Sequence, residues 1–243
     1  MMDDGVGTNY NALRASVQHR FDHGFTLLAV YTYSKCLQDT EMLSNKLQGS
    51  TRSNPYSRMA DYGPCDYDLR HNFTASFVYA GYKFKSYWLN FFAGGWSPAF
   101  LVSAYNGFPF SPMTGTDASL SEVGLDRPNL VPGVDRYNRS LHNSASVPTW
   151  INRGAYVTNP PGTFGNVGMN SLVGPGYKNT DVTLSKYIPV HEQQNFQLRF
   201  EFFNVFNQTN FMAPVNSLNS GQFGRVQAAN PARIIQLAAK YNF

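Results

Sequence analysis

The side chains that most often do chemistry are few in this chain of 243 residues. The two cysteines, Cys36 and Cys65, are too few to predict a disulfide framework or a zinc site. His19 and His23 lie four residues apart, but a predicted strand end and a turn separate them, which argues against a shared metal ion. The chain also lacks a Gly-x-Ser-x-Gly elbow and a phosphate-binding glycine-rich loop. We therefore expect no enzymatic activity, no catalytic residue and no cofactor.

Three aspartates, Asp61, Asp66 and Asp68, form the densest acidic cluster. They lack the Gly and Glu positions of a calcium-binding helix–loop–helix loop. The sequence therefore predicts no metal site, and loose calcium binding in an external loop is the weaker alternative.

The composition is unusual for a soluble domain. Aromatic residues make up 15% of the chain and charged residues only 14%, against roughly 25% charged residues in typical soluble domains. The mean hydropathy is −0.34, and no run approaches the roughly 20 apolar residues of a membrane helix. The net charge of +4 comes from scattered residues, which argues against a nucleic-acid partner. Few charges, many aromatics and middling hydropathy are typical of a membrane β-barrel.

Strict alternation of apolar and polar residues is the main structural signal. Between residues 196 and 202 the even positions are large and apolar, whereas Gln197, Arg199 and Glu201 are polar. Such a segment predicts a β-strand with one apolar and one polar face. Similar segments lie at 10–20, 25–35, 70–80, 177–187 and 233–243, and residues 88–105 are apolar and aromatic with weaker alternation. Eleven residues at about 3.3 Å each and a tilt of about 40° span roughly 28 Å, enough for the apolar band of an outer-membrane barrel.

The connections between these seven predicted strands alternate in length. The short ones are 21–24, 81–87 and 188–195, and the long ones are 36–69, 106–176 and 207–232. Short periplasmic turns and long extracellular loops produce this asymmetry in an antiparallel transmembrane β-barrel. Cys36 and Cys65 then lie at the two ends of the first long loop, in an oxidising compartment. Either a disulfide at the base of the loop or two free thiols fits this arrangement.

On the polar side of the predicted strands, charged side chains face the barrel lumen. These candidates are Arg14, Arg20, Asp181, Arg199, Glu201 and Lys240. They can contact a transported solute, or they can form ion pairs that hold the wall, and we favour the second role. For Tyr137, Trp150 and Tyr156 in the long loops, ligand capture and loop-on-loop packing are the corresponding alternatives.

The last strand carries aromatic and apolar residues at every second position. Leu237, Ala239 and Tyr241 precede the terminal Phe243 in this spacing. The pattern resembles the signal by which the barrel-assembly machinery recognises outer-membrane proteins.

A series of short motifs, in order along the chain, resembles the barrel repeats of Oar-like TonB-dependent receptors of the Acidobacteria type, in the carboxypeptidase-regulatory-like family. The motifs are NYNALRASV at 9–17, YTYSK at 31–35, DYGP at 61–64, RHNF at 70–73, GFPF at 107–110, RPN at 127–129, FEFFNVFN at 200–207 and PARIIQL at 231–237. The resemblance runs from about Asn9 to the end of the chain.

The resemblance implies that residues 1–243 are the C-terminal part of a 22-stranded receptor barrel in the bacterial outer membrane. A signal peptide and a plug domain are absent from the chain, and we expect them upstream. The implied role is uptake of a bulky nutrient, energised by an inner-membrane complex that acts through the missing N-terminal part. The implied partners are outer-membrane lipid, the barrel-assembly machinery, that energy-transducing complex and an unknown nutrient.

Two alternatives remain at this point. A structural or adhesive outer-membrane barrel has the same strands and loops but moves no solute. A soluble carbohydrate-binding β-sandwich is the less favoured alternative, and it requires the apolar face of residues 196–202 to pack against a second sheet.

Overall fold

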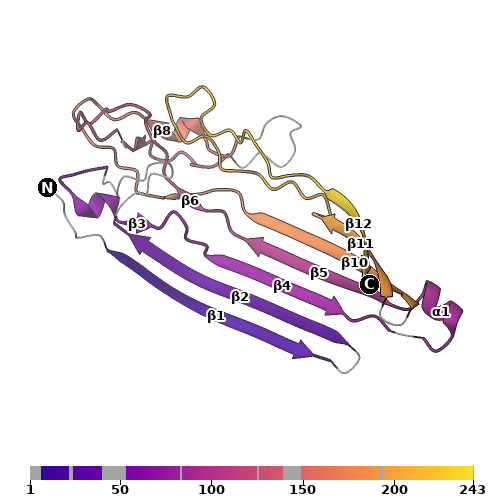
Figure 1. The fold of residues 1–243 in the computed structure, drawn as a ribbon. Coiled ribbons are helices and arrows are strands. Elements are labelled where there is room, and N and C mark those ends of the chain that lie inside the picture. Colours follow the sequence, from indigo (N-terminus) through magenta and orange to yellow (C-terminus); the bar gives the residue numbers. More distant parts are fainter. Residues whose placement is uncertain are drawn as a thin grey trace.

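The computed structural model describes residues 7–21, 24–39, 53–82, 84–124, 126–138, 149–191 and 194–242. One antiparallel sheet dominates it, and its seven long strands lie side by side in sequence order (Figure 1). These strands are β1 (Thr8–Arg20), β2 (Phe25–Gln38), β4 (His71–Tyr79), β5 (Trp96–Tyr105), β10 (Tyr177–His191), β11 (Gln194–Phe203) and β12 (Ile234–Asn242). The two-residue strand β3 (Gly63–Pro64) pairs with the end of β2. The predicted all-β architecture is confirmed.

The strand register gives the sheet one apolar and one polar face. One cross-strand row consists of His19, Leu27, Phe77, Phe100, Val182, Phe202 and Ile235. A row on the opposite face consists of Arg20, Thr26, Val78, Ala99, Thr183, Glu201 and Gln236. Because side chains alternate between faces along every strand, this register keeps most large apolar residues on one side.

The apolar face is open over most of its area. Leu237 is 71% exposed and Leu13 is 69% exposed, and Phe100 in the middle of the sheet is still 39% exposed. The β-sandwich alternative requires a second sheet on this face, and none of the described elements provides one. Within the described residues, no helix is long and apolar enough to cross a membrane.

The two ends of the sheet differ sharply. The described parts of the long connections 39–70, 106–176 and 204–233 all lie at one end, and those of the short connections lie at the other (Figure 1). This distribution matches the predicted arrangement of extracellular loops and periplasmic turns. We therefore call the two ends the loop end and the turn end.

Two predicted boundaries at the turn end are wrong. The strand expected at 88–105 begins only at Trp96, because residues Tyr87–Phe92 form the short helix α1. The helix ends at Phe92, and Gly95, directly before β5, has a left-handed φ of 70° that turns the chain into this strand. The turn expected at 188–195 is also shorter, because β10 continues to His191 and β11 already begins at Gln194.

Candidate functional site

The long connections fold together into what we call the loop layer, residues 53–70, 106–124, 126–138, 149–176 and 204–233. Its short elements are η1 (Arg58–Asp61), β6 (Pro109–Phe110), β7 (Asn129–Leu130), η3 (Arg153–Ala155), β8 (Tyr156–Val157) and β9 (Leu172–Val173). β6 pairs with β9, and β7 pairs with β8. The third connection joins this framework, because Met113 forms a β-bridge with Ser217 and Thr149 forms one with Arg225.

The loop layer has a hydrophobic core of its own. Its buried members are Ile151, Ala155, Tyr156, Val167, Leu172, Leu218 and Phe223. Trp150 and Tyr137 pack against this core, and both bind the main chain of Val173. The Trp150 Nε1–H donates to the Val173 carbonyl over 2.9 Å, and the Val173 N–H donates to the Tyr137 hydroxyl over 2.8 Å. For these three loop aromatics, the structure therefore shows packing contacts within the layer.

The loop layer covers the polar face of the sheet at the loop end of β2. At the loop end of β2, the polar-face residues Ser34, Cys36 and Gln38 are all at least 95% buried. Tyr33, which points to the opposite face of the same strand, is 44% exposed. The Ser34 hydroxyl donates to the Leu69 carbonyl over 2.8 Å, which ties the sheet to the layer above it.

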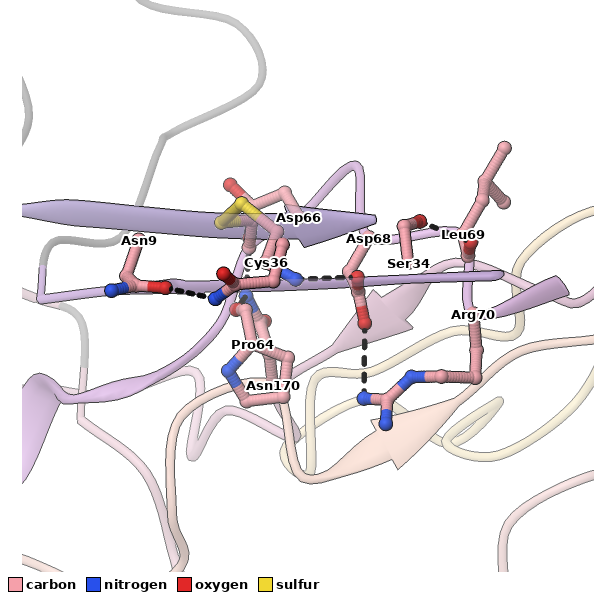
Figure 2. The surroundings of a disulfide bond; sticks show 11 residues. Asn9, Ser34, Cys36, Pro64, Asp66, Asp68, Leu69, Arg70 and Asn170 are labelled. Carbon is pink, nitrogen blue, oxygen red and sulfur yellow. Dashed lines mark hydrogen bonds and ion pairs between the residues drawn. A yellow bond between two sulfur atoms is a disulfide. The ribbon is translucent and has the colours of Figure 1, made fainter. Parts of the chain in front are cut away.

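A disulfide joins Cys36 on β2 to Cys65 in the loop layer, with the two Cα atoms 5.3 Å apart (Figure 2). The buried Asp68 carboxylate lies beside it and accepts the Cys36 backbone N–H over 2.8 Å. Arg70 donates to the other oxygen of Asp68 over 3.3 Å. Of the two arrangements that the sequence leaves open for these cysteines, the structure has the bonded one.

A buried ion pair connects two of the long connections. Arg127 Nη2 lies 2.8 Å from Asp61 Oδ1, and both side chains are at least 95% buried. The same guanidinium donates to the Ala60 carbonyl over 2.7 Å and to the Val167 carbonyl over 2.9 Å. One arginine therefore links η1 to two separate parts of the second connection.

The three aspartates are engaged by protein groups. Asp61 binds Arg127 and Ser53, Asp68 binds Arg70, and Asp66 accepts a hydrogen bond from Asn170. Their carboxylates do not converge, and the described part of the chain holds no cluster of three or more His, Cys, Asp or Glu that suits a metal ion.

The structure places the six predicted lumen residues on one face but not in one cluster. The register puts Arg14, Arg20, Asp181, Arg199, Glu201 and Lys240 on the polar face. Arg199 and Glu201 form an ion pair within β11. Asp181 accepts the Asn204 backbone N–H over 2.9 Å, where the third connection begins. Arg14 and Arg20 lie on one edge strand and Lys240 on the opposite one.

The predicted assembly signal lies on the other face. Leu237, Ala239 and Tyr241 share the apolar face of β12, and the Tyr241 ring lies 4.8 Å from that of Phe196. Phe243 is outside the described residues.

Sequence reasoning missed the residues that organise the loop layer. Arg127 begins the RPN motif at 127–129, but its ion-pair partner Asp61 lies far away in the sequence, so no local pattern could pair them. Lys186 was also missed, and its signal was available: it occupies an even position of β10, where the alternation calls for an apolar residue.

Reduction of the disulfide should loosen the loop base without unfolding the sheet. In the Cys36→Ser/Cys65→Ser protein, residues 36–65 are no longer closed into a covalent loop. The locally unfolded state of this segment therefore has more conformational entropy and is more populated. We expect tryptic cleavage after Arg58 to become several-fold faster, while the heat-modifiable gel mobility of the barrel stays unchanged. Equal cleavage rates in both proteins would contradict a structural role for this bond.

The loop core should respond to alkaline pH through Tyr156. Burial raises the pKa of its hydroxyl from 10.0 to about 12. The unfolded layer therefore loses this proton first, so the stability that the neutral phenol contributes falls as pH rises from 10 to about 12. Trp150 fluorescence should report this step, and Tyr156→Phe should abolish it. Because the buried hydroxyl has no hydrogen-bond partner among the described residues, we expect Tyr156→Phe to leave the layer at least as stable at neutral pH.

Comparison with known proteins gives one match. A family model described as "Outer membrane beta barrel domain" matches residues 1–236. No curated protein and no solved structure matches the chain.

Proposed function

This chain belongs to the outer membrane beta barrel domain family, and from that premise we propose that it forms part of the wall and the external vestibule of a TonB-dependent receptor for a bulky nutrient. The family is located in the bacterial outer membrane. In that setting the open apolar face of the sheet meets lipid, and the polar face meets the lumen.

One observation carries the proposal: the loop layer is built over the loop end of the polar face. A layer with its own core, a disulfide and a buried ion pair is a preformed surface at the mouth of the lumen. It also has an open hollow between the second and third connections, lined by Arg153, Tyr156, Val157, Leu218 and Asn219. An open, rigid hollow suits capture of a bulky ligand better than sieving of small solutes.

A second observation supports a body inside the lumen. Leu28, Val78 and Leu101 are neighbours on the polar face, below the loop layer, and each is at least 40% exposed. An apolar patch on a water-facing wall usually marks a contact surface. In the proposed receptor this surface contacts the plug.

The proposed role is binding and passage, without a chemical step. The inner-membrane energy-transducing complex acts on the plug, and the loop layer captures the nutrient. The apolar face of β12, with Leu237 and Tyr241, is the proposed contact for the barrel-assembly machinery during insertion.

Growth genetics can test this proposal in the native bacterium. One strain lacks the gene for this protein, and a second lacks the inner-membrane energy-transducing complex. Both are grown on a panel of oligosaccharides and peptides as sole nutrients. We expect the first strain to fail on one bulky nutrient, and the second strain to fail on the same nutrient among others.

Passive entry and adhesion give different outcomes. A nutrient that requires this protein but not the energy-transducing complex would indicate a diffusion pore. Loss of surface attachment with normal growth on every nutrient would indicate the structural or adhesive barrel. Either result would overturn the receptor proposal.

A further inference from the structure

The turn end of the sheet carries a helix on its lipid-facing side. α1 connects β4 to β5 and extends from the end opposite the loop layer (Figure 1). Two apolar-face side chains contact it: the Trp96 Nε1–H donates to the Phe92 carbonyl over 3.0 Å, and Lys186 reaches the carbonyls of Asn90 and Gly94. The helix therefore lies against the apolar face of the wall.

Lys186 fixes this position. Its register partners Trp96 and Leu198 show that it points to the apolar face, where a bare ammonium group would be costly in lipid. Lys186 is only 4% exposed, and the carbonyl oxygens of Asn90 and Gly94, at the C-terminal end of α1, accept hydrogen bonds from its ammonium group. The ammonium also lies 5.1 Å from the centre of the Trp96 ring. Helix C-termini and aromatic faces both stabilise a cation.

The surface of α1 that faces away from the wall is strongly apolar. Trp88 and Phe92 are each 68% exposed, and Leu89 and Phe91 are exposed beside them. Tyr82 and Phe84, just before the helix, add two more exposed rings. A group of exposed aromatic side chains of this kind is unfavourable in water and indicates a contact surface.

These rings continue an aromatic band on the wall itself. At the same end of the apolar face, the Phe25 ring stacks 4.3 Å from Tyr79, and Phe196 lies 4.8 Å from Tyr241. Aromatic girdles of this kind mark the membrane–water interfaces of outer-membrane barrels. The turn end is the periplasmic end, so the band lies at the periplasmic leaflet.

We propose that α1 is an in-plane anchor in the periplasmic leaflet of the outer membrane, bound by phospholipid, and that Lys186 is the positioning residue that holds it to the barrel wall. The exposed Lys85 just before the helix provides a positive charge for the phosphate groups of that leaflet. The occupant is lipid because the helix surface is continuous with the lipid-facing wall. This proposal rests on the outer-membrane location and does not require nutrient uptake.

Fluorescence quenching can test the anchor in the full-length protein. Residues 1–243 contain three tryptophans, Trp88, Trp96 and Trp150. Two variants are made in which every tryptophan of the protein is Phe except Trp88 or except Trp150. Each protein is folded into vesicles of phosphatidylethanolamine and phosphatidylglycerol, with a spin label near the head group or deep in the acyl chain. Acrylamide serves as the water-soluble quencher.

We expect the head-group label to quench Trp88 several-fold more than the deep label, and acrylamide to quench it weakly. Trp150, in the loop layer, should be insensitive to both lipid labels. Strong acrylamide quenching of Trp88 without lipid quenching would overturn the proposal. Protection from all three quenchers would also overturn it, since another part of the protein or a partner would then cover the helix.

The positioning role of Lys186 has a separate test. Lys186→Met should reduce head-group quenching of Trp88 several-fold, because the helix loses its attachment, and Lys186→Arg should restore most of it. Lys178→Met is the matched control, since Lys178 lies on the same strand and face at the loop end. Heat-modifiable mobility verifies that each variant is folded. Unchanged quenching in folded Lys186→Met would contradict this role.

Discussion

Arg127→Met should loosen the loop layer, because Arg127 links the first and second long connections. The substitution leaves the Asp61 carboxylate fully buried beside Ser53 without its cation. Removal of one partner of a buried ion pair usually costs about 3–5 kcal/mol, because the remaining charge is uncompensated. We expect a loss of this size in the local opening free energy of the loop amides, measured by hydrogen–deuterium exchange. Amides of β10 and β11 should keep their protection.

Two further variants test whether loss of the ion pair causes the faster exchange in Arg127→Met. Arg127→Met combined with Asp61→Leu removes both charges and should recover most of the lost protection. Arg225→Met removes an exposed arginine of the same layer and should change the opening free energy by no more than about 0.5 kcal/mol. If the double variant exchanges as fast as Arg127→Met, the hydrogen bonds to Ala60 and Val167 carry the effect instead of the ion pair.

Leu184→Arg should impair insertion into the bilayer. Leu184 lies at the middle of β10, between Pro98 and Phe200 on the apolar face. An arginine at the lipid-facing midplane of an outer-membrane barrel costs about 2–4 kcal/mol. We expect this loss in the unfolding free energy from a urea titration of the protein in vesicles, read by heat-modifiable mobility.

The adjacent residue provides the control. Thr183 points to the polar face, where its cross-strand neighbour is Glu201. Thr183→Arg adds the same charge to the same strand, but in water and near a carboxylate, so it should be close to neutral. Equal losses for the two variants would contradict the assignment of the faces.

The sheet was predictable from the sequence because its determinants are local. A strand with lipid on one side and water on the other must alternate, and residues 196–202 show this within seven positions. The difference in connection length then assigns the two ends. The helix α1 was missed because an aromatic run is apolar on every side, so its sequence fits a buried strand as well as a helix in an interface.

The loop layer could not be predicted, because its determinants are not local. Asp61 and Arg127 are 66 residues apart, and only the fold brings them together. Ile151 and Phe223 share one core across two separate connections. Alternation alone predicts that the six charged residues share one face of the sheet, but their separation across that face depends on strand order.

The most direct test of the two faces is a cysteine scan along β11. Single cysteines at positions 196 to 202 are labelled with a fluorescent probe in the folded protein, in which Cys36 and Cys65 are buried and bonded to each other. Brominated phospholipids then quench the probes. If the apolar face meets lipid, quenching is strong at positions 196, 198, 200 and 202 and weak at 197, 199 and 201, following the register of β11. Quenching without this alternation, or stronger quenching at the odd positions, would contradict lipid contact of the apolar face.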